Sequence, residues 1–85
     1  MKTQKLPPKL SNQAAKKING MDSRDKARVK ESIIGIPFGD IKPLKGCKGS
    51  YRLRNGNWRI IFSWMSDEQI FVEKIDHRGQ IYKGV

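Results

Sequence analysis

Apolar and polar residues alternate along the second half of the chain, which is the pattern of half-buried β-strands. The first alternating stretch, YRLRNGNWRIIF, covers residues 51–62 and contains two strands joined by a short turn. After a polar segment at 66–68, residues 69–77 return as a third antiparallel strand. A two-residue and a three-residue loop at this second turn would exchange which of Glu73 and Lys74 faces the core. The pattern does not decide between these two registers.

The dipeptide Asn55-Gly56 is the strongest short sequence signal for a two-residue hairpin loop, of the type in which both central residues have a positive φ. With this loop, Arg52 lies opposite Arg59, and Arg54 shares their face of the sheet because side chains alternate between faces. The apolar side chains share the other face: Tyr51, Leu53, Trp58 and Ile60. Like charges opposite one another destabilise a strand pair by about 0.2–1 kcal/mol. The arginines therefore make this face a candidate polyanion site, and the alternative is a solvated face with partial pairing to the nearby carboxylates, Glu73 and Asp76.

The first half of the chain has apolar residues at helical spacing from about residue 8 to residue 36. Gly20 divides this region into two helices, and Asp22 or Ser23 can cap the second one. The apolar faces consist of Leu10, Ala14, Ala15 and Ile18 in the first helix, and of Val29, Ile33 and Ile36 in the second. Residues 37–49 are rich in Gly, Pro and Lys and are predicted to be a loop.

With 85 residues the chain has the length of one domain, predicted here over residues 1–85. The order of elements predicts an α+β fold, in which two N-terminal antiparallel helices pack on one face of a small, mainly antiparallel, twisted β-sheet. The sheet is a β-meander over about residues 50–83, ending in a short edge strand at 80–83.

The chain carries 18 Lys and Arg against 8 Asp and Glu, which gives a net charge of +10. A field of this sign favours nucleic acid, an anionic membrane surface or an acidic protein as partner. No stretch approaches the ~18 apolar residues of a membrane span, and the N-terminal residues lack the apolar run of a signal peptide. We therefore expect a cytoplasmic protein without a membrane partner.

Cys47 and His77 are the only cysteine and the only histidine of the chain. A single cysteine excludes an internal disulfide, and the two residues together cannot form a zinc cluster or a polyhistidine site. We expect neither a metal nor a cofactor.

The segments together resemble a known protein family. The pattern L-x-G…Y-R-[LI]-R-x-G-x-[YW]-R-[IV]-[IV]-[FY]…H-R-x-x-[IV]-Y is satisfied from Leu44 to Tyr82, after the two predicted helices. It is similar to the RelE/ParE toxin superfamily of bacterial type II toxin–antitoxin systems. The resemblance implies a RelE-like fold and a ribosome-dependent endoribonuclease (an mRNA interferase). Such an enzyme cleaves mRNA in the A site of the 30S subunit, by attack of the ribose 2′-OH on the adjacent phosphate. It also implies contact with rRNA and a cognate acidic antitoxin protein.

The resemblance assigns catalytic roles to four residues. Arg59 takes the place of the arginine that stabilises the phosphorane-like transition state, and Arg52 the place of the basic residue opposite it. Arg78 is the candidate proton donor or charge stabiliser, and Tyr82 stacks on a nucleobase. Negative charge accumulates on the nonbridging oxygens during such a reaction, so fixed guanidinium groups suit it.

The remaining site candidates are basic residues and the histidine. Arg54, Lys45 and Lys48 are expected to bind RNA without taking part in the chemical step. The best-known family member has lysines where this chain has Ser50 and Arg52, and arginine cannot easily act as a general base. His77 lies beside Arg78 in sequence and is the side-chain type that gains and loses a proton near neutral pH. The group that accepts the 2′-OH proton is left open by the sequence.

Two other functions are compatible with this sequence. A ParE-type inhibitor of DNA gyrase would keep the fold, but that branch usually lacks the full set of arginines and tyrosine. A nucleic-acid-binding module without catalysis would bind with a steep salt dependence and would have no chemical step to lose.

Overall fold

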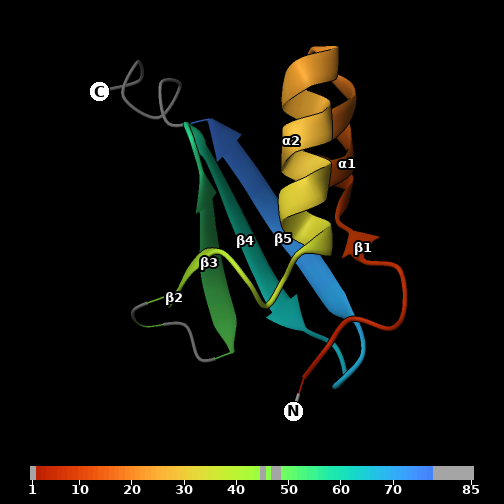
Figure 1. Ribbon diagram of the computed structural model, residues 1–85, viewed down its shortest axis with the longest axis vertical. Coiled ribbons are helices and arrows are strands. Elements are labelled where there is room, and N and C mark those ends of the chain that lie inside the picture. The colour runs from red at the N-terminus through yellow and green to blue at the C-terminus, as the bar shows by residue number, and fades with distance from the viewer. Residues whose placement is uncertain (1, 45, 47–48, 78–85) are drawn as a thin grey trace.

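The computed structural model describes residues 2–44, 46 and 49–77. Its elements are, in order, β1 (Lys9–Leu10), α1 (Asn12–Asn19), α2 (Ser23–Ile34), β2 (Asp40–Pro43), β3 (Ser50–Asn55), β4 (Trp58–Trp64) and β5 (Ile70–His77). The five strands form one sheet in the order β1-β5-β4-β3-β2, and both helices lie on the same side of it (Figure 1). All strand pairs are antiparallel except β1 with β5, which is parallel. The predicted α+β class is confirmed. Neither described helix has the length and apolar composition needed to cross a membrane.

The two helices begin at capping side chains. Ser11 Oγ accepts a hydrogen bond from the Ala14 N–H, and the Asp22 carboxylate accepts one from the Asp25 N–H. The first helix therefore begins at residue 12, and the prediction of a start near residue 8 was wrong. The preceding residues form β1 instead, because the Ser11 cap ends the extended segment that pairs with β5.

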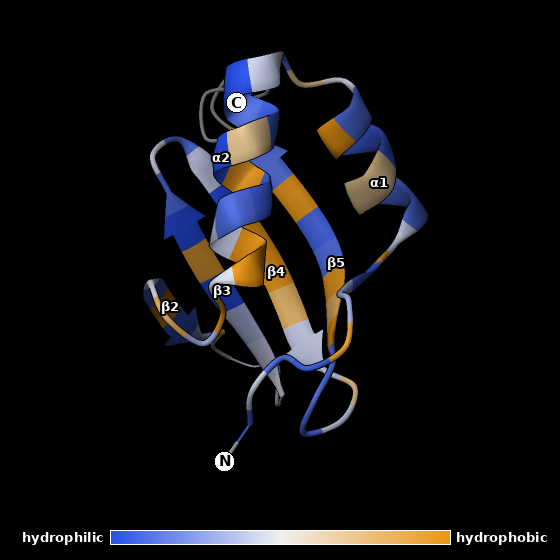
Figure 2. Ribbon diagram, turned by 45° about the vertical axis from the view of Figure 1, so that its right-hand side comes forward, coloured by the Kyte–Doolittle hydropathy of each residue, from blue (hydrophilic) through white to orange (hydrophobic). Residues whose placement is uncertain are grey.

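The core lies between the helices and the sheet, and Figure 2 shows the apolar positions of both layers. The helical half contributes Ala14, Ile18, Met21, Val29, Ile33 and Ile36, and the strands contribute Leu53, Trp58, Ile60, Phe62, Ile70, Val72 and Ile75. Because this core covers only one side of the sheet, the side chains on the other side remain available for ligands.

The edge strand β2 occupies part of the segment that was predicted to be a loop. Residues 40–43 pair antiparallel with β3, with Ile41 opposite Leu53 and Lys42 opposite Arg52. Sequence periodicity missed this strand because it is short, ends in Pro43, and lies at the sheet edge where proline is tolerated. The predicted strand at 80–83 lies outside the described residues.

The β3–β4 loop is Gly56-Asn57, so the predicted Asn55-Gly56 loop was wrong. Gly56 has a φ of 59°, and no other residue type in the described part of the chain has a positive φ. A turn with glycine at its first central position needs only one positive φ, which this sequence supplies without straining an asparagine.

This loop shifts the strand pairing but not the faces. Arg59 lies opposite Arg54, and Arg52 lies opposite Ile61. Relative to the predicted pairing, Arg59 has moved two positions along β3, and a shift by two residues keeps every side chain on its own face. The prediction that the three arginines share one face is therefore confirmed.

The sequence left open which of Glu73 and Lys74 faces the core, and a β-bulge in β5 keeps both of them out of it. Ile61 pairs with Lys74 and Phe62 pairs with Val72, so Glu73 is the extra residue. Val72 and Ile75 are both fully buried, and the bulge removes both intervening polar residues from the core.

Candidate functional site

The sheet face turned away from the helices carries three of the eight site residues named in the sequence: Arg52, Arg54 and Arg59. We call it the open face, and the register places on it Asp40, Lys42, Ser50, Arg52, Arg54, Arg59, Ile61, Ser63, Phe71, Glu73, Lys74 and Asp76. Two rows cross the sheet, and each takes one residue from each of the strands β2, β3, β4 and β5. One row is Asp40–Arg54–Arg59–Asp76, and the other is Lys42–Arg52–Ile61–Lys74.

The first row places two cations between two carboxylates. Arg54 and Arg59 lie directly opposite each other, an arrangement that destabilises the strand pair by about 0.2–1 kcal/mol. Arg59 Nη2 is 3.9 Å from Asp76 Oδ2, which is too long for a hydrogen bond. Lys74 Nζ lies 3.7 Å from the same oxygen. Asp76 thus balances charge in this row while leaving the Arg59 donors available.

The second row contains three cations and no carboxylate of its own, and of these cations Lys74 pairs with Asp76 of the first row. Arg52 lies between Lys42 on the edge strand and Ile61 on β4. In the part of the chain that the structure describes, Arg52 has no ion pair within 4 Å. This row is the more strongly electropositive part of the open face.

Two buried donors on this face lack acceptors. The Nε atoms of Arg52 and Arg59 are buried, and no hydrogen-bond partner for them exists among the described residues. A buried donor without a partner destabilises the folded protein by about 1–3 kcal/mol. A phosphate group carries several oxygens that accept from guanidinium groups, so the arrangement is suited to binding a phosphodiester.

The structure separates His77 from these arginines. His77 pairs with Trp58, and the two rings are in edge contact with centroids 4.7 Å apart. Trp58 is a core residue, and the adjacent pair of residues, Arg59 with Asp76, lies on the open face. His77 therefore lies on the helix side of the sheet, and the expectation that it shares a site with Arg52 and Arg59 was wrong. Alternation along β5 could have indicated this only if the position of the bulge had been known.

Four other predicted site residues lie outside the described residues: Arg78, Tyr82, Lys45 and Lys48. Their roles stay predictions.

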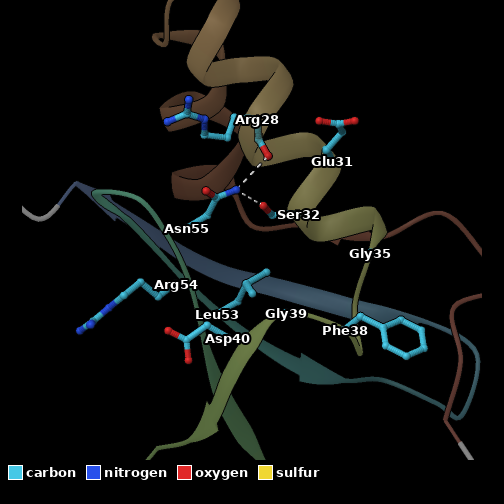
Figure 3. A pocket seen from close by; sticks show the side chains of 10 residues that line it. All are labelled: Arg28, Glu31, Ser32, Gly35, Phe38, Gly39, Asp40, Leu53, Arg54 and Asn55. Atoms are coloured by element: carbon cyan, nitrogen blue, oxygen red, sulfur yellow. Dashed lines mark hydrogen bonds between the residues drawn. The ribbon is translucent and has the colours of Figure 1, made fainter.

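A hollow of about 420 Å³ lies between α2 and the β2–β3 edge (Figure 3). Asn55 projects from the end of β3 toward α2, where its Nδ2 donates to Arg28 O at 3.4 Å and to Ser32 Oγ. Arg54 borders the hollow but extends away from α2. The sequence pattern gave no sign of these hydrogen bonds, because Asn55 was predicted to lie in the loop. The hydrogen bonds fix the β3–β4 turn, and with it the strand ends that carry Arg54 and Arg59.

No protein-family model and no curated protein sequence matches the chain. Solved structures do match it. A chain of the RelB–RelE antitoxin–toxin complex from Methanococcus jannaschii superimposes with a TM-score of 0.70 at 25% identity, covering 89% of this chain and 96% of that one. The toxin–antitoxin complex RelBE2 from Mycobacterium tuberculosis gives 0.68 at 22% identity, over 84% and 95% of the two chains. The archaeal RelE–RelB complex from Pyrococcus horikoshii gives 0.67 at 23% identity, over 94% and 99%. These similarities confirm the resemblance seen in the sequence: the chain has the fold of RelE-type toxins.

Proposed function

We propose that this chain is the toxin of a type II toxin–antitoxin system and cleaves mRNA in the ribosomal A site. The observation that carries the proposal is the pair of buried Nε donors of Arg52 and Arg59, which have no acceptor among the described residues and lie on a face free of described helices. The similarity to chains from RelB–RelE complexes supports a toxin, and the basic open face supports an RNA substrate.

In the proposed reaction the 2′-oxygen attacks the adjacent phosphorus, and the bond to the 5′-oxygen breaks. Negative charge grows on the nonbridging oxygens, where Arg52 and Arg59 donate hydrogen bonds. Losing one fixed donor of this kind typically raises the barrier by about 2.7–4 kcal/mol. Arg54 and Lys42 bind neighbouring phosphates. By resemblance, Arg78 and Tyr82 contribute charge stabilisation and base stacking, and Lys45 and Lys48 bind RNA. The ribosome orients the substrate, which lets few protein groups suffice.

An acidic antitoxin is the proposed protein partner. The net charge of +10 favours association with an acidic chain. The similar solved structures are complexes of a toxin with its antitoxin, which supports a partner of this kind for the present chain.

The test uses purified ribosomes programmed with mRNA and read by primer extension. The wild-type chain is expected to cut in the A-site codon and to leave a 2′,3′-cyclic phosphate, which identifies 2′-OH attack. Arg59→Ala and Arg52→Ala should each be about 10²–10³-fold slower. Arg24→Ala is the matched control, because Arg24 is exposed on α2, away from the open face.

Intact mRNA at saturating wild-type protein would refute the proposal. Stabilised gyrase–DNA cleavage complexes would then favour the ParE-type reading. Salt-sensitive RNA binding without cleavage would favour a non-catalytic module.

A further inference from the structure

None of the groups described so far has been assigned as the acceptor of the 2′-OH proton. Arginine stays protonated and cannot accept this proton. His77 lies on the helix side of the sheet. The described carboxylates on the open face are Asp40, Glu73 and Asp76.

These three carboxylates differ in their exposure and in the number of cations that lie close to them. Asp76 has both Arg59 and Lys74 within 4 Å. Asp40 is exposed at the outer end of its row, on the edge strand. Glu73 is half-buried and accepts one hydrogen bond, from Ser50 Oγ at 3.4 Å. Among the described residues it has no cation within 4 Å, so its oxygens remain free to take a proton.

The bulge holds Glu73 in a fixed place. Ser11 Oγ donates to Glu73 O at 2.7 Å, and the Ser11 N–H donates to Val72 O at 2.9 Å. On the other side of the bulge, Gln13 both donates to and accepts from the Ile75 backbone at 3.0 Å. Bulges commonly redirect a side chain next to an active site. Here the first turn of α1 fixes the backbone from which the Glu73 side chain extends.

The Ser50 contact locates the Glu73 carboxylate relative to the arginines. Ser50 is on β3 and Glu73 on β5, so the hydrogen bond passes over β4 on the open face. Ser50 precedes Arg52 by two residues on the same face, about 7 Å along the strand. Arg52 lies opposite Ile61, and Arg59 is two residues before Ile61. Ser50 lies opposite Ser63, so on β4 Ile61 lies between the position of the Glu73 carboxylate and Arg59, with Arg52 directly beside Ile61.

We propose that Glu73 is the general base of the cleavage reaction, an inference that rests on the proposed function. The Glu73 carboxylate takes the proton of the ribose 2′-OH as the 2′-oxygen bonds to phosphorus. The bond from phosphorus to the 5′-oxygen breaks, and the leaving oxygen takes a proton from solvent. The products are a 2′,3′-cyclic phosphate and a 5′-hydroxyl, and the proton on Glu73 returns to water.

The test measures single-turnover cleavage of ribosome-bound mRNA at saturating toxin as a function of pH. Wild type is expected to lose rate toward acidic pH, as a base becomes protonated. Glu73→Gln keeps the size and the Ser50 contact but cannot accept the proton, so it should be about 10²–10⁴-fold slower and should lose this acidic decline. Glu73→Asp should be slower than wild type but keep the decline. Glu68→Gln, in the exposed β4–β5 turn, is the matched control.

The other charged groups around Glu73 on the open face are Lys42, Arg52, Arg59, Lys74 and Asp76. Asp76 is the only other carboxylate among them, so Asp76→Asn should keep the acidic decline.

Three results would overturn the inference. If Glu73→Gln cleaves at the wild-type rate, Glu73 is not the base, while the proposed function stands. If Glu73→Gln is slow but keeps the acidic decline, Glu73 only positions its neighbours. If wild type leaves mRNA intact, the proposed function fails, and the base role fails with it. Circular dichroism of each variant verifies folding, and Glu73→Asp keeps a carboxylate at this position if Glu73→Gln fails to fold.

Discussion

Replacing Arg52 with methionine is expected to stabilise the fold while slowing cleavage. The Nε of Arg52 is buried and has no acceptor in the part of the chain that the structure describes, and removing such a donor relieves about 1–3 kcal/mol. Lys42 lies directly opposite on the edge strand, and removing this like-charge pair relieves about 0.2–1 kcal/mol more. Methionine keeps an apolar stem against Ile61, and no ion pair among the described residues is lost.

The net stabilisation should be at least about 1 kcal/mol, which raises the Tm of a domain of this size by about 4–8 °C. Thermal and urea denaturation followed by circular dichroism measure it, with Arg24→Met on α2 as control. The cleavage rate of the same variant should fall by about 10²–10³-fold. An unchanged or lower Tm for Arg52→Met would refute the inference that the Arg52 side chain destabilises the folded protein. Opposite effects on stability and activity are typical of residues kept for function.

Three further effects should follow from the described contacts. Sulfate at millimolar concentration should raise the Tm of wild type more than that of Arg52→Met, because an anion that binds only the folded protein stabilises it. If sulfate raises the Tm of wild type no more than chloride at the same ionic strength does, the open face has no specific anion site. Ser11→Ala should lower the free energy of unfolding in urea by about 1–2 kcal/mol, since it removes the α1 cap and the hydrogen bond to the Glu73 carbonyl in the bulge. An unchanged free energy of unfolding would show that neither hydrogen bond stabilises the protein. Gly56→Ala should reduce the free energy of unfolding by about 1 kcal/mol or more, because Gly56 has a φ of 59°. Gly20→Ala is the control and should have a clearly smaller effect, because Gly20 has a φ of −85°. Equal losses of stability in the two variants would disprove the role of the turn geometry.

The sequence alone predicted the features that depend on a residue's type and on whether it occupies an odd or an even position in its strand. Alternation placed Arg52, Arg54 and Arg59 on one face, and this result survived an error in the loop because the error moved the register by an even number of residues. Helical spacing found both helices, but the start of α1 depended on whether Ser11 caps the helix or lies within it.

The remaining features depend on contacts between distant segments. The bulge at Glu73 is held by Ser11 and Gln13, which lie 62 residues earlier than their respective partners Glu73 and Ile75. No local pattern encodes such a pairing, so the face of every residue after the bulge was uncertain. For this reason the sequence could not show that His77 lies beside Trp58, away from the arginines.

The parallel pairing of β1 with β5 has a consequence for the order of folding. β5 lies inside the sheet, between β4 and β1, and it supplies Ile70, Val72 and Ile75 to the core. The β3–β4 hairpin can form from local contacts, but the sheet cannot close around its N-terminal edge until residues 70–77 have been synthesised. Closure then has to bring together segments that are far apart in the chain, which slows folding. The nascent polypeptide therefore cannot assemble the complete open face, including the Glu73 bulge, before its last described strand leaves the ribosome that makes it.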